Sequence, residues 1–262
     1  MRVRFLLLLL LASALSSSAA RADTTTASAT GFCPGPQGVS FQVTINFTPT
    51  GPGAATVKFT LENTSGVYPV QNPSLGNPVL TGFFFNVPPG TGVVFTEGRI
   101  LAGSTLVSNG GTINSIPVPA GCAVLGTDLV RTTWYALVAG QATGQYGIFT
   151  SGLTTAEGLK AGLVDPDVYV ACVAQGAVFA PIFVAGRVQF TIQLTNLPAS
   201  FTSAQTFLGL CSTVSGQQQP SSIAGKFQAT GHNGADSCFI GRDCNSTSAH
   251  TSTWGTVKTF YR

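Results

Sequence analysis

Two segments in the first quarter of the chain alternate strictly between apolar and polar residues. In residues 39–48 every odd-numbered residue is apolar and every even-numbered residue is polar, and residues 55–62 repeat the pattern. Side chains of a β-strand point alternately to its two faces, so each segment predicts a strand with one apolar and one polar face. The Gly- and Pro-rich residues 49–53 between them are typical of a turn. Together they predict an antiparallel hairpin that packs on a core by one face.

Further strand candidates follow, separated by Gly, Pro and Asn. Residues 79–87 (VLTGFFFNV) are apolar without alternation, which predicts a strand that is buried on both faces or twisted at a bulge. Residues 187–195 alternate cleanly. The other candidates are residues 92–96, 99–107, 132–139, 168–174, 178–185, 205–211, 225–230 and 253–261. Residues 154–163 suggest a short helix, because Thr154 and Glu157 have capping-box spacing. Strands that recur without alternating helices predict an all-β fold, an antiparallel β-sandwich of the jelly-roll kind.

The first 22 residues have the three parts of a secretory signal peptide. Two arginines precede an apolar run, and Ala20-Arg21-Ala22 supplies small residues at the cleavage site. We expect the mature chain to begin at Asp23, with residues 23–35 as a mobile leader and residues 36–262 as a single β-sandwich domain. No later run of about 18 apolar residues predicts a membrane span.

Charged residues make up 8% of the chain, against about 25% in an average soluble protein. Three of the 12 basic residues lie in the expected signal peptide, which leaves 9 to balance the 9 acidic residues of the mature chain. A neutral, charge-poor surface has no electrostatic attraction for nucleic acid or anionic lipid. We therefore expect no nucleic-acid partner.

All the cysteines lie after the expected cleavage site. An even number of cysteines in an exported chain predicts disulfide bonds, because the compartments outside the cytoplasm are oxidising. Six cysteines allow 15 pairings, and we predict one of them, Cys238–Cys244, because its short loop closes at little entropic cost. The six residues are Cys33, Cys122, Cys172, Cys211, Cys238 and Cys244.

The two histidines of the chain flank the last two cysteines. His232, Cys238, Cys244 and His250 are each separated by five residues, and two cysteines with two histidines form a legitimate tetrahedral zinc set. Structural zinc sites usually have two to four residues between paired cysteines, and an oxidising compartment favours the disulfide. We therefore expect no metal and no other cofactor, with this zinc set as the alternative.

No catalytic residues are recognisable in the sequence. A serine triad would need one of the two histidines and a Gly-x-Ser-x-Gly elbow, which the chain lacks. None of the acidic residues stands in a context that predicts a pair of glycosidase carboxylates. Glu62 is expected to be solvated or to face a cation across the sheet, and Asp165-Pro166-Asp167 to start a turn rather than to bind calcium.

Aromatic residues offer an alternative function. Trp134 and Trp254 could stack on a sugar ring, as the aromatic residues of carbohydrate-binding modules do. Because neighbouring side chains point to opposite faces of a strand, Trp134 and Tyr135 cannot both face one ligand. The residues thus leave a carbohydrate-binding module, or an accessory domain of a secreted glycan-acting system, as the second interpretation.

Two stretches resemble a known family. Residues 57–87 contain L-E-N-T-S and V-L-T-G-F-F-F-N-V-P, and residues 187–227 contain V-Q-F-T-I-Q-L-T-N-L-P, F-L-G-L-C and I-A-G-K-F. These are similar to the β-rich domains of exosortase-sorted (PEP-CTERM-type) bacterial surface proteins. The resemblance implies a β-sandwich of the cell envelope or extracellular matrix without general enzymatic activity. Residues 257–262 lack the family's Pro-Glu-Pro motif, membrane segment and basic cluster, so we expect a secreted or periplasmic protein.

The leading interpretation combines these expectations. The chain is expected to be an exported, non-enzymatic β-sandwich protein of the cell envelope or extracellular matrix, with a structural or adhesive role. Its partners would be an extracellular glycan or other envelope proteins.

Overall fold

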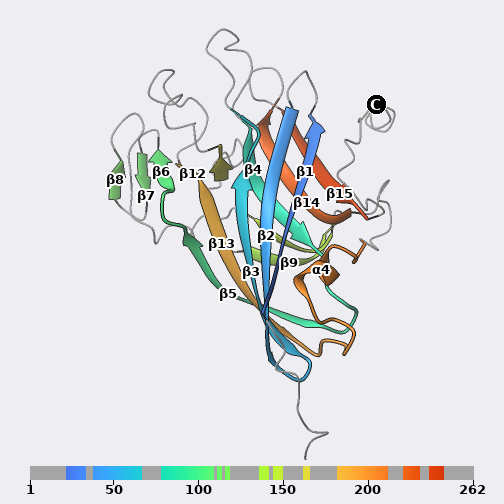
Figure 1. The fold of residues 1–262 in the computed structure, drawn as a ribbon. Helices are drawn as coiled ribbons and strands as arrows, with labels where there is room; N and C mark the ends of the chain where they lie inside the picture. Colours follow the sequence, from blue (N-terminus) through green and yellow to red (C-terminus); the bar gives the residue numbers. More distant parts are fainter. Residues whose placement is uncertain are drawn as a thin grey trace, which may run out of the picture.

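The computed structural model describes part of the chain. The described residues are 22–33, 38–66, 78–108, 111–113, 116–118, 136–141, 144–149, 162–165, 182–211, 221–230 and 236–244. Within them, strands form two main sheets that pack face to face (Figure 1). The prediction of an all-β, disulfide-containing sandwich is confirmed.

The first sheet is antiparallel and has five strands in the order β1-β2-β3-β13-β5. Its strands are β1 (Asp23–Phe32), β2 (Gly38–Gly51), β3 (Ala54–Asn63), β13 (Arg187–Thr195) and β5 (Gly92–Ile100). In the β2–β3 hairpin Val43 lies opposite Leu61, and Phe47 lies opposite Val57. Both pairs are fully buried, so the apolar half of the predicted alternation faces the core.

The second sheet is built around β4. Its order is β15-β14-β4-β11-β12-β6, and β10 pairs with both β4 and β9. Its strands are β4 (Val79–Phe85), β6 (Thr105–Ser108), β9 (Ala136–Gln141), β10 (Gly144–Phe149), β11 (Gly162–Val164), β12 (Ile182–Ala185), β14 (Ser221–Thr230) and β15 (Asp236–Asp243). Every residue of β4 is buried, as predicted for a strand covered on both faces. The β11–β12 pair is parallel.

Two small elements lie outside the main sheets. β7 (Gly111–Ile113) and β8 (Ile116–Val118) form a separate hairpin, and α4 (Ala204–Phe207) is a single helical turn. Among the described residues, no helix has the length and hydropathy needed to cross a membrane.

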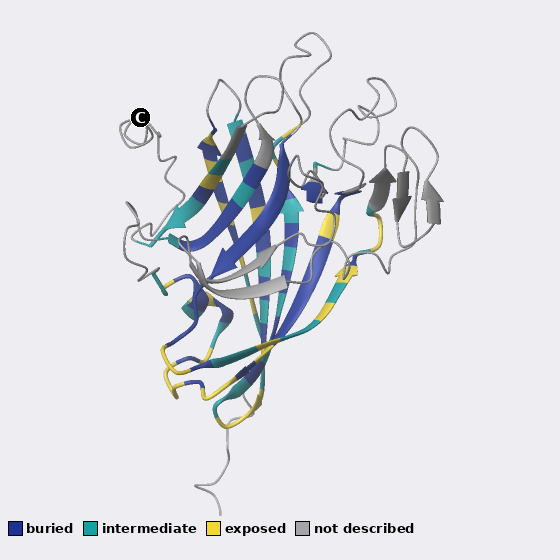
Figure 2. Cartoon of the chain, turned by 180° about the vertical axis from the view of Figure 1, so that it is seen from behind, coloured by how far each residue is buried: buried dark blue, intermediate teal, exposed yellow. Residues whose placement is uncertain are grey.

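Phenylalanine rings fill the space between the two sheets. The centroid of the Phe59 ring on β3 lies 4.9 Å from that of Phe85 and 5.3 Å from that of Phe83, both on β4. It also lies 5.6 Å from Phe207 of α4. Figure 2, seen from the side of the second sheet, shows that buried positions follow the strands of both sheets. The core therefore joins both sheets and the helical turn through one aromatic cluster.

The prediction of a mobile leader at residues 23–35 is wrong for residues 23–32. Residues 23–32 form β1, which pairs with β2 along its whole length. Its inward positions are small residues such as Ala27 and Ala29, which are buried, whereas the alternating Thr and Ser side chains are exposed. The period of a strand is present, but alanine carries little of the hydrophobic signal by which a strand is recognised.

Other expectations need smaller corrections. The prediction of a strand at residues 205–211 is wrong, because these residues lie in α4 and the turn after it. The two candidates at 92–96 and 99–107 cover β5 and β6, but the break between these strands lies at residues 101–104 and not at 97–98. The candidate strands at 168–174 and 253–261 lie outside the described residues, as do residues 1–21 of the expected signal peptide. So does most of the predicted helix at 154–163, whose last two residues belong to β11.

Candidate functional site

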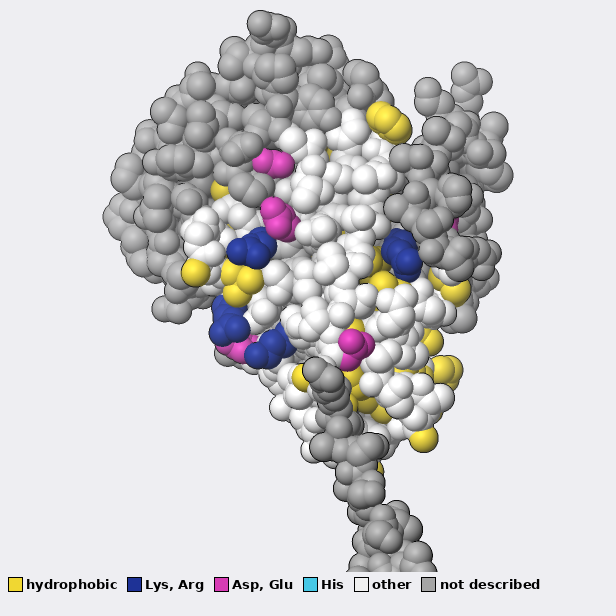
Figure 3. All heavy atoms as spheres, viewed as in Figure 1, with side chains coloured by type: hydrophobic (Ala, Val, Ile, Leu, Met, Phe, Trp, Pro, Cys, Tyr) yellow, Lys and Arg dark blue, Asp and Glu magenta, His cyan; other side chains and the backbone are white. Residues whose placement is uncertain are grey.

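The outward positions of the first sheet form a continuous polar surface. Hydroxyl and amide side chains alternate with the buried core residues on four neighbouring strands. Gln189 and Thr191 of this face are buried, and its other residues are half-buried or exposed. The polar face consists of Thr24, Thr26, Ser28, Thr30, Ser40, Gln42, Thr44, Asn46, Thr48, Thr56, Thr60, Gln189, Thr191, Gln193 and Thr195. Figure 3, seen from this side, shows few charged side chains over the described part of the face.

A row of side chains in register crosses the whole sheet. Thr26, Thr44, Thr60, Gln189 and Arg99 lie opposite one another on β1, β2, β3, β13 and β5. The hydroxyls of Thr26 and Thr44 are 3.3 Å apart, and Gln189 Nε2 donates to Thr60 Oγ1 at 3.0 Å. Arg99 donates from Nε and Nη2 to Gln189 Oε1, at 2.9 and 2.6 Å. These hydrogen bonds orient the polar groups on the sheet.

Charged residues of both signs border this row. Lys58 is the cation at the centre, and Arg99 and Arg187 lie toward the β5 side together with Glu97. The register places Glu62 opposite Arg187, which is one of the two environments expected for Glu62. The face therefore has mixed charge and little net attraction for a strongly charged partner.

The chemistry of the polar face is that of hydrogen bonding. A hydroxyl group both donates and accepts, and an amide offers two donors and an acceptor. Strands lie about 4.8 Å apart and outward residues repeat about every 6.8 Å along a strand. Such a grid can pair with the hydroxyl and amide groups of a neutral polar surface.

Two disulfide bonds fasten the sandwich at β15. Cys33, just after β1, bonds to Cys238 near the start of β15. Cys211, after α4, bonds to Cys244, the residue that follows β15. The Cα–Cα distance is 5.5 Å in both pairs. One bond therefore joins the two sheets, and the other joins β15 to the segment that follows the helical turn.

The predicted Cys238–Cys244 bond is wrong. The backbone between these two residues belongs to β15, and an extended chain rises about 3.3 Å per residue. Six such steps separate the two Cα atoms by about 20 Å, whereas a disulfide tolerates no more than about 7 Å. Entropy favours the short loop, but strand pairing holds its ends apart.

Neither cysteine of the zinc set considered from the sequence is available as a thiolate ligand. Cys238 and Cys244 are in different disulfide bonds, and His232 and His250 lie outside the described residues. Within the described part of the chain, no three Cys, His, Asp or Glu side chains gather as metal ligands would.

Other predicted site residues lie outside the described part of the chain. These are Cys122, Cys172, Trp134 and Trp254, so the carbohydrate contact by the tryptophans stays a prediction. Of the predicted Asp-Pro-Asp turn, Asp165 is described, and its Oδ2 accepts a hydrogen bond from the Gly66 amide at 3.0 Å.

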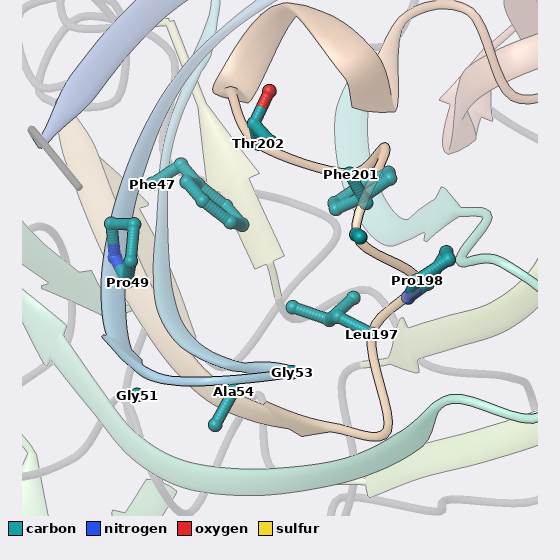
Figure 4. Close-up of a pocket in the computed structure, with 10 residues that line it drawn as sticks. Phe47, Pro49, Gly51, Gly53, Ala54, Leu197, Pro198, Phe201 and Thr202 are labelled. Carbon is teal, nitrogen blue, oxygen red and sulfur yellow. The ribbon is translucent and has the colours of Figure 1, made fainter. Parts of the chain in front are cut away.

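A small pocket opens at the end of the sandwich where β2 turns into β3. It has a volume of about 150 Å³ and lies between this turn and the segment from β13 to α4 (Figure 4). Phe47, Leu197, Pro198 and Phe201 contribute to its apolar walls, and Thr202 is the one polar side chain among the lining residues. A cavity of this size has room for a group such as a benzene ring. Its lining side chains supply no acid, base or nucleophile other than a hydroxyl.

The sequence alone does not predict that the polar face is a candidate site. The alternation in residues 39–48 and 55–62 predicts one polar face for each strand, but it does not show that the polar faces of distant strands join into one surface. The remaining strands of the face were hidden for different reasons. The sequence of β1 resembles a polar leader, and the pairing of β13 with β3 joins segments more than 120 residues apart.

We expect the Cys33–Cys238 bond to contribute more stability than the Cys211–Cys244 bond. The double variant C33S/C238S should lose about 2–4 kcal/mol of unfolding free energy, because the unfolded chain regains the freedom of a long loop. The sequence separations are 205 and 33 residues, so C211S/C244S should lose about 1–2 kcal/mol less. Urea unfolding of both variants measures the difference, and a larger loss in C211S/C244S would refute the loop-length argument.

Comparisons with known proteins do not extend this description. No protein-family model matches the chain, and neither a curated protein nor a solved structure does. The function is therefore inferred from the geometry and the sequence.

Proposed function

We propose that this chain is an exported, non-enzymatic β-sandwich protein of the cell envelope or extracellular matrix, with a structural or adhesive role. The observation that carries the proposal is the polar face. It is a broad grid of hydroxyl and amide groups on a sheet whose opposite side is the aromatic core.

The rigidity of the sheet supports a contact role for this face. Outward residues on β2 and β3 alternate with fully buried ones such as Ile45 and Phe59, so the backbone beneath the polar groups is held by the core. Hydrogen bonds between side chains, such as that from Thr24 Oγ1 to Asn46 Oδ1 at 2.6 Å, already restrict their rotamers. Groups that are ordered before binding lose less conformational entropy when they bind.

The disulfide bonds support folding outside the cytoplasm. Structural disulfides persist in oxidising compartments and are rare in the cytosol. Together with the signal peptide expected at residues 1–22, they favour a secreted, extracellular or periplasmic location.

The mixed charge of the face supports a neutral partner. An extracellular glycan or an envelope protein with exposed polar groups would find hydrogen-bond donors and acceptors on this face. The face would not repel it electrostatically, because its charges are of both signs. Many weak hydrogen bonds made at the same time can retain a protein on an extended surface, because their contributions to the binding free energy combine.

A charge-insertion experiment tests this role. In the double variant T26R/Q42R, two long cations stand on exposed positions of neighbouring strands of the face. Retention of the purified protein on isolated cell-envelope and matrix fractions should fall by about 10-fold or more, a loss of about 1.4 kcal/mol or more. The control T50R places the same side chain at an exposed position near the β2–β3 turn, and it should be retained like the wild type.

The outcomes separate the two interpretations. Equal retention of T26R/Q42R and T50R would refute a contact role for the polar face. Binding to a glycan array that survives in T26R/Q42R but is lost in W134A or W254A would instead assign the function to the carbohydrate-binding alternative.

A further inference from the structure

We propose that a thiol–disulfide isomerase is a folding partner of this chain, because its native disulfides are reached through exchange of a non-native Cys238–Cys244 bond. The observation is the order of the paired cysteines along the chain. Cys211 lies inside the loop closed by Cys33–Cys238, and Cys238 lies inside the loop closed by Cys211–Cys244. The two native bonds interleave, so neither joins cysteines that are adjacent in the sequence.

The unfolded chain favours a different pairing. The entropy of loop closure depends on sequence separation, which is 6 residues for Cys238 and Cys244 and 205 for Cys33 and Cys238. This dependence favours closing the short loop by about 200-fold over the Cys33–Cys238 loop. Relative to Cys211–Cys244, with a separation of 33 residues, the advantage is about 10-fold. Cys238–Cys244 is therefore the bond expected first when the reduced chain meets an oxidant.

This early bond blocks both native bonds at once. Each native disulfide uses one of the two sulfurs, Cys238 for the bond to β1 and Cys244 for the bond after α4. The early bond also prevents the intervening residues from extending as β15, which pairs with β14 in the native sheet. Folding of β15 and the early bond exclude each other, so the bond must be broken before the second sheet is complete.

Conversion of the Cys238–Cys244 bond into the Cys211–Cys244 bond needs no oxidant, because each step exchanges one disulfide for another. The isomerase thiolate attacks Sγ of Cys244, the Cys238–Cys244 bond breaks, and Cys238 leaves as a thiolate. The Cys211 thiolate then attacks the same Cys244 sulfur in the mixed disulfide, forms the native bond and releases the isomerase thiolate. The Cys33 and Cys238 thiolates are afterwards oxidised by a low-molecular-weight disulfide such as glutathione disulfide, which is reduced to two thiols.

Tryptic mapping can follow each of these bonds. Cleavage after the basic residues places Cys33, Cys211, Cys238 and Cys244 on separate peptides, which are residues 22–58, 188–226, 227–242 and 243–258. The full chain is reduced, denatured and refolded in a glutathione buffer with and without a protein disulfide isomerase, and samples are quenched by alkylation. The linked pair 227–242/243–258 should appear before the pair 188–226/243–258. The isomerase should speed formation of the native pair by about 10-fold or more.

A variant that cannot form the early bond completes the test. In C33S/C238S the acceleration of Cys211–Cys244 formation by the isomerase should fall at least several-fold. Acceleration that persists undiminished would overturn the proposal. It would also be overturned if the wild-type chain formed its native bonds without the 227–242/243–258 intermediate and at a rate that the isomerase leaves unchanged. The intermediate is read from the wild-type chain, so that result does not depend on whether the variant folds.

Discussion

Replacement of Asn63 by Asp is expected to lower the free energy of unfolding by about 3–5 kcal/mol, because it sets a buried charge against two carbonyl groups. Asn63 ends β3 and is fully buried. Its Nδ2 donates to the carbonyl oxygen of Pro78 at 2.9 Å and to that of Leu163 at 2.8 Å. Its Oδ1 accepts from the Ser65 amide at 3.0 Å. One side chain thus joins the end of the first sheet to the start of β4 and to β11.

The substitution N63D keeps the shape of the side chain and removes both donors. Urea unfolding under non-reducing conditions measures the loss. The matched control is N46D on the polar face, where the side chain accepts a hydrogen bond from Thr24 and lies opposite Lys58. An aspartate keeps that acceptor, so N46D should stay within about 0.5 kcal/mol of the wild type. Equal stabilities of N63D and N46D would refute the role of Asn63 as a junction.

The variant F59A is expected to lose about 3–5 kcal/mol of unfolding free energy, because it leaves a cavity in the aromatic cluster. Phe59 is fully buried, and its ring packs against Phe83 and Phe85 of β4 and against Phe207 of α4. The lost contacts therefore weaken three elements at once. The loss is measured by chemical unfolding.

The control for this cavity is the same substitution at an exposed position. Phe32 ends β1 and is 58% exposed, so F32A should change the unfolding free energy by no more than about 0.5 kcal/mol. A small loss in F59A, similar to that in F32A, would contradict the packing of the two sheets through Phe59.

The parts of the fold that sequence reasoning recovered are those with large side chains at every second position. β2, β3 and β13 have Phe, Ile, Val or Leu inward and polar residues outward, so hydrophobicity and period agree. β1 has the same period with Ala and Gly inward, and its signal is too weak to separate it from a polar leader. In α4, the apolar residues Ala204 and Phe207 are buried, but a single helical turn is too short to show a period.

Long-range features could not be read from local spacing. The cross-sheet row depends on the order in which distant strands meet. The disulfide pairs depend on the same order, since strand pairing separates Cys238 from Cys244 and brings Cys33 beside β15. Only the number of cysteines and the expected compartment were informative, and they predicted disulfide bonds without their partners.

The most direct test of this account is a non-reducing tryptic map of the protein recovered from outside the cytoplasm of an exporting host. Signal cleavage before Asp23 predicts a first peptide of residues 23–58, linked through Cys33 to residues 227–242. Cys211 should link residues 188–226 to residues 243–258. A stable protein with a direct link between residues 227–242 and 243–258, or with these cysteines reduced, would contradict a β-sandwich held together by the Cys33–Cys238 and Cys211–Cys244 bonds.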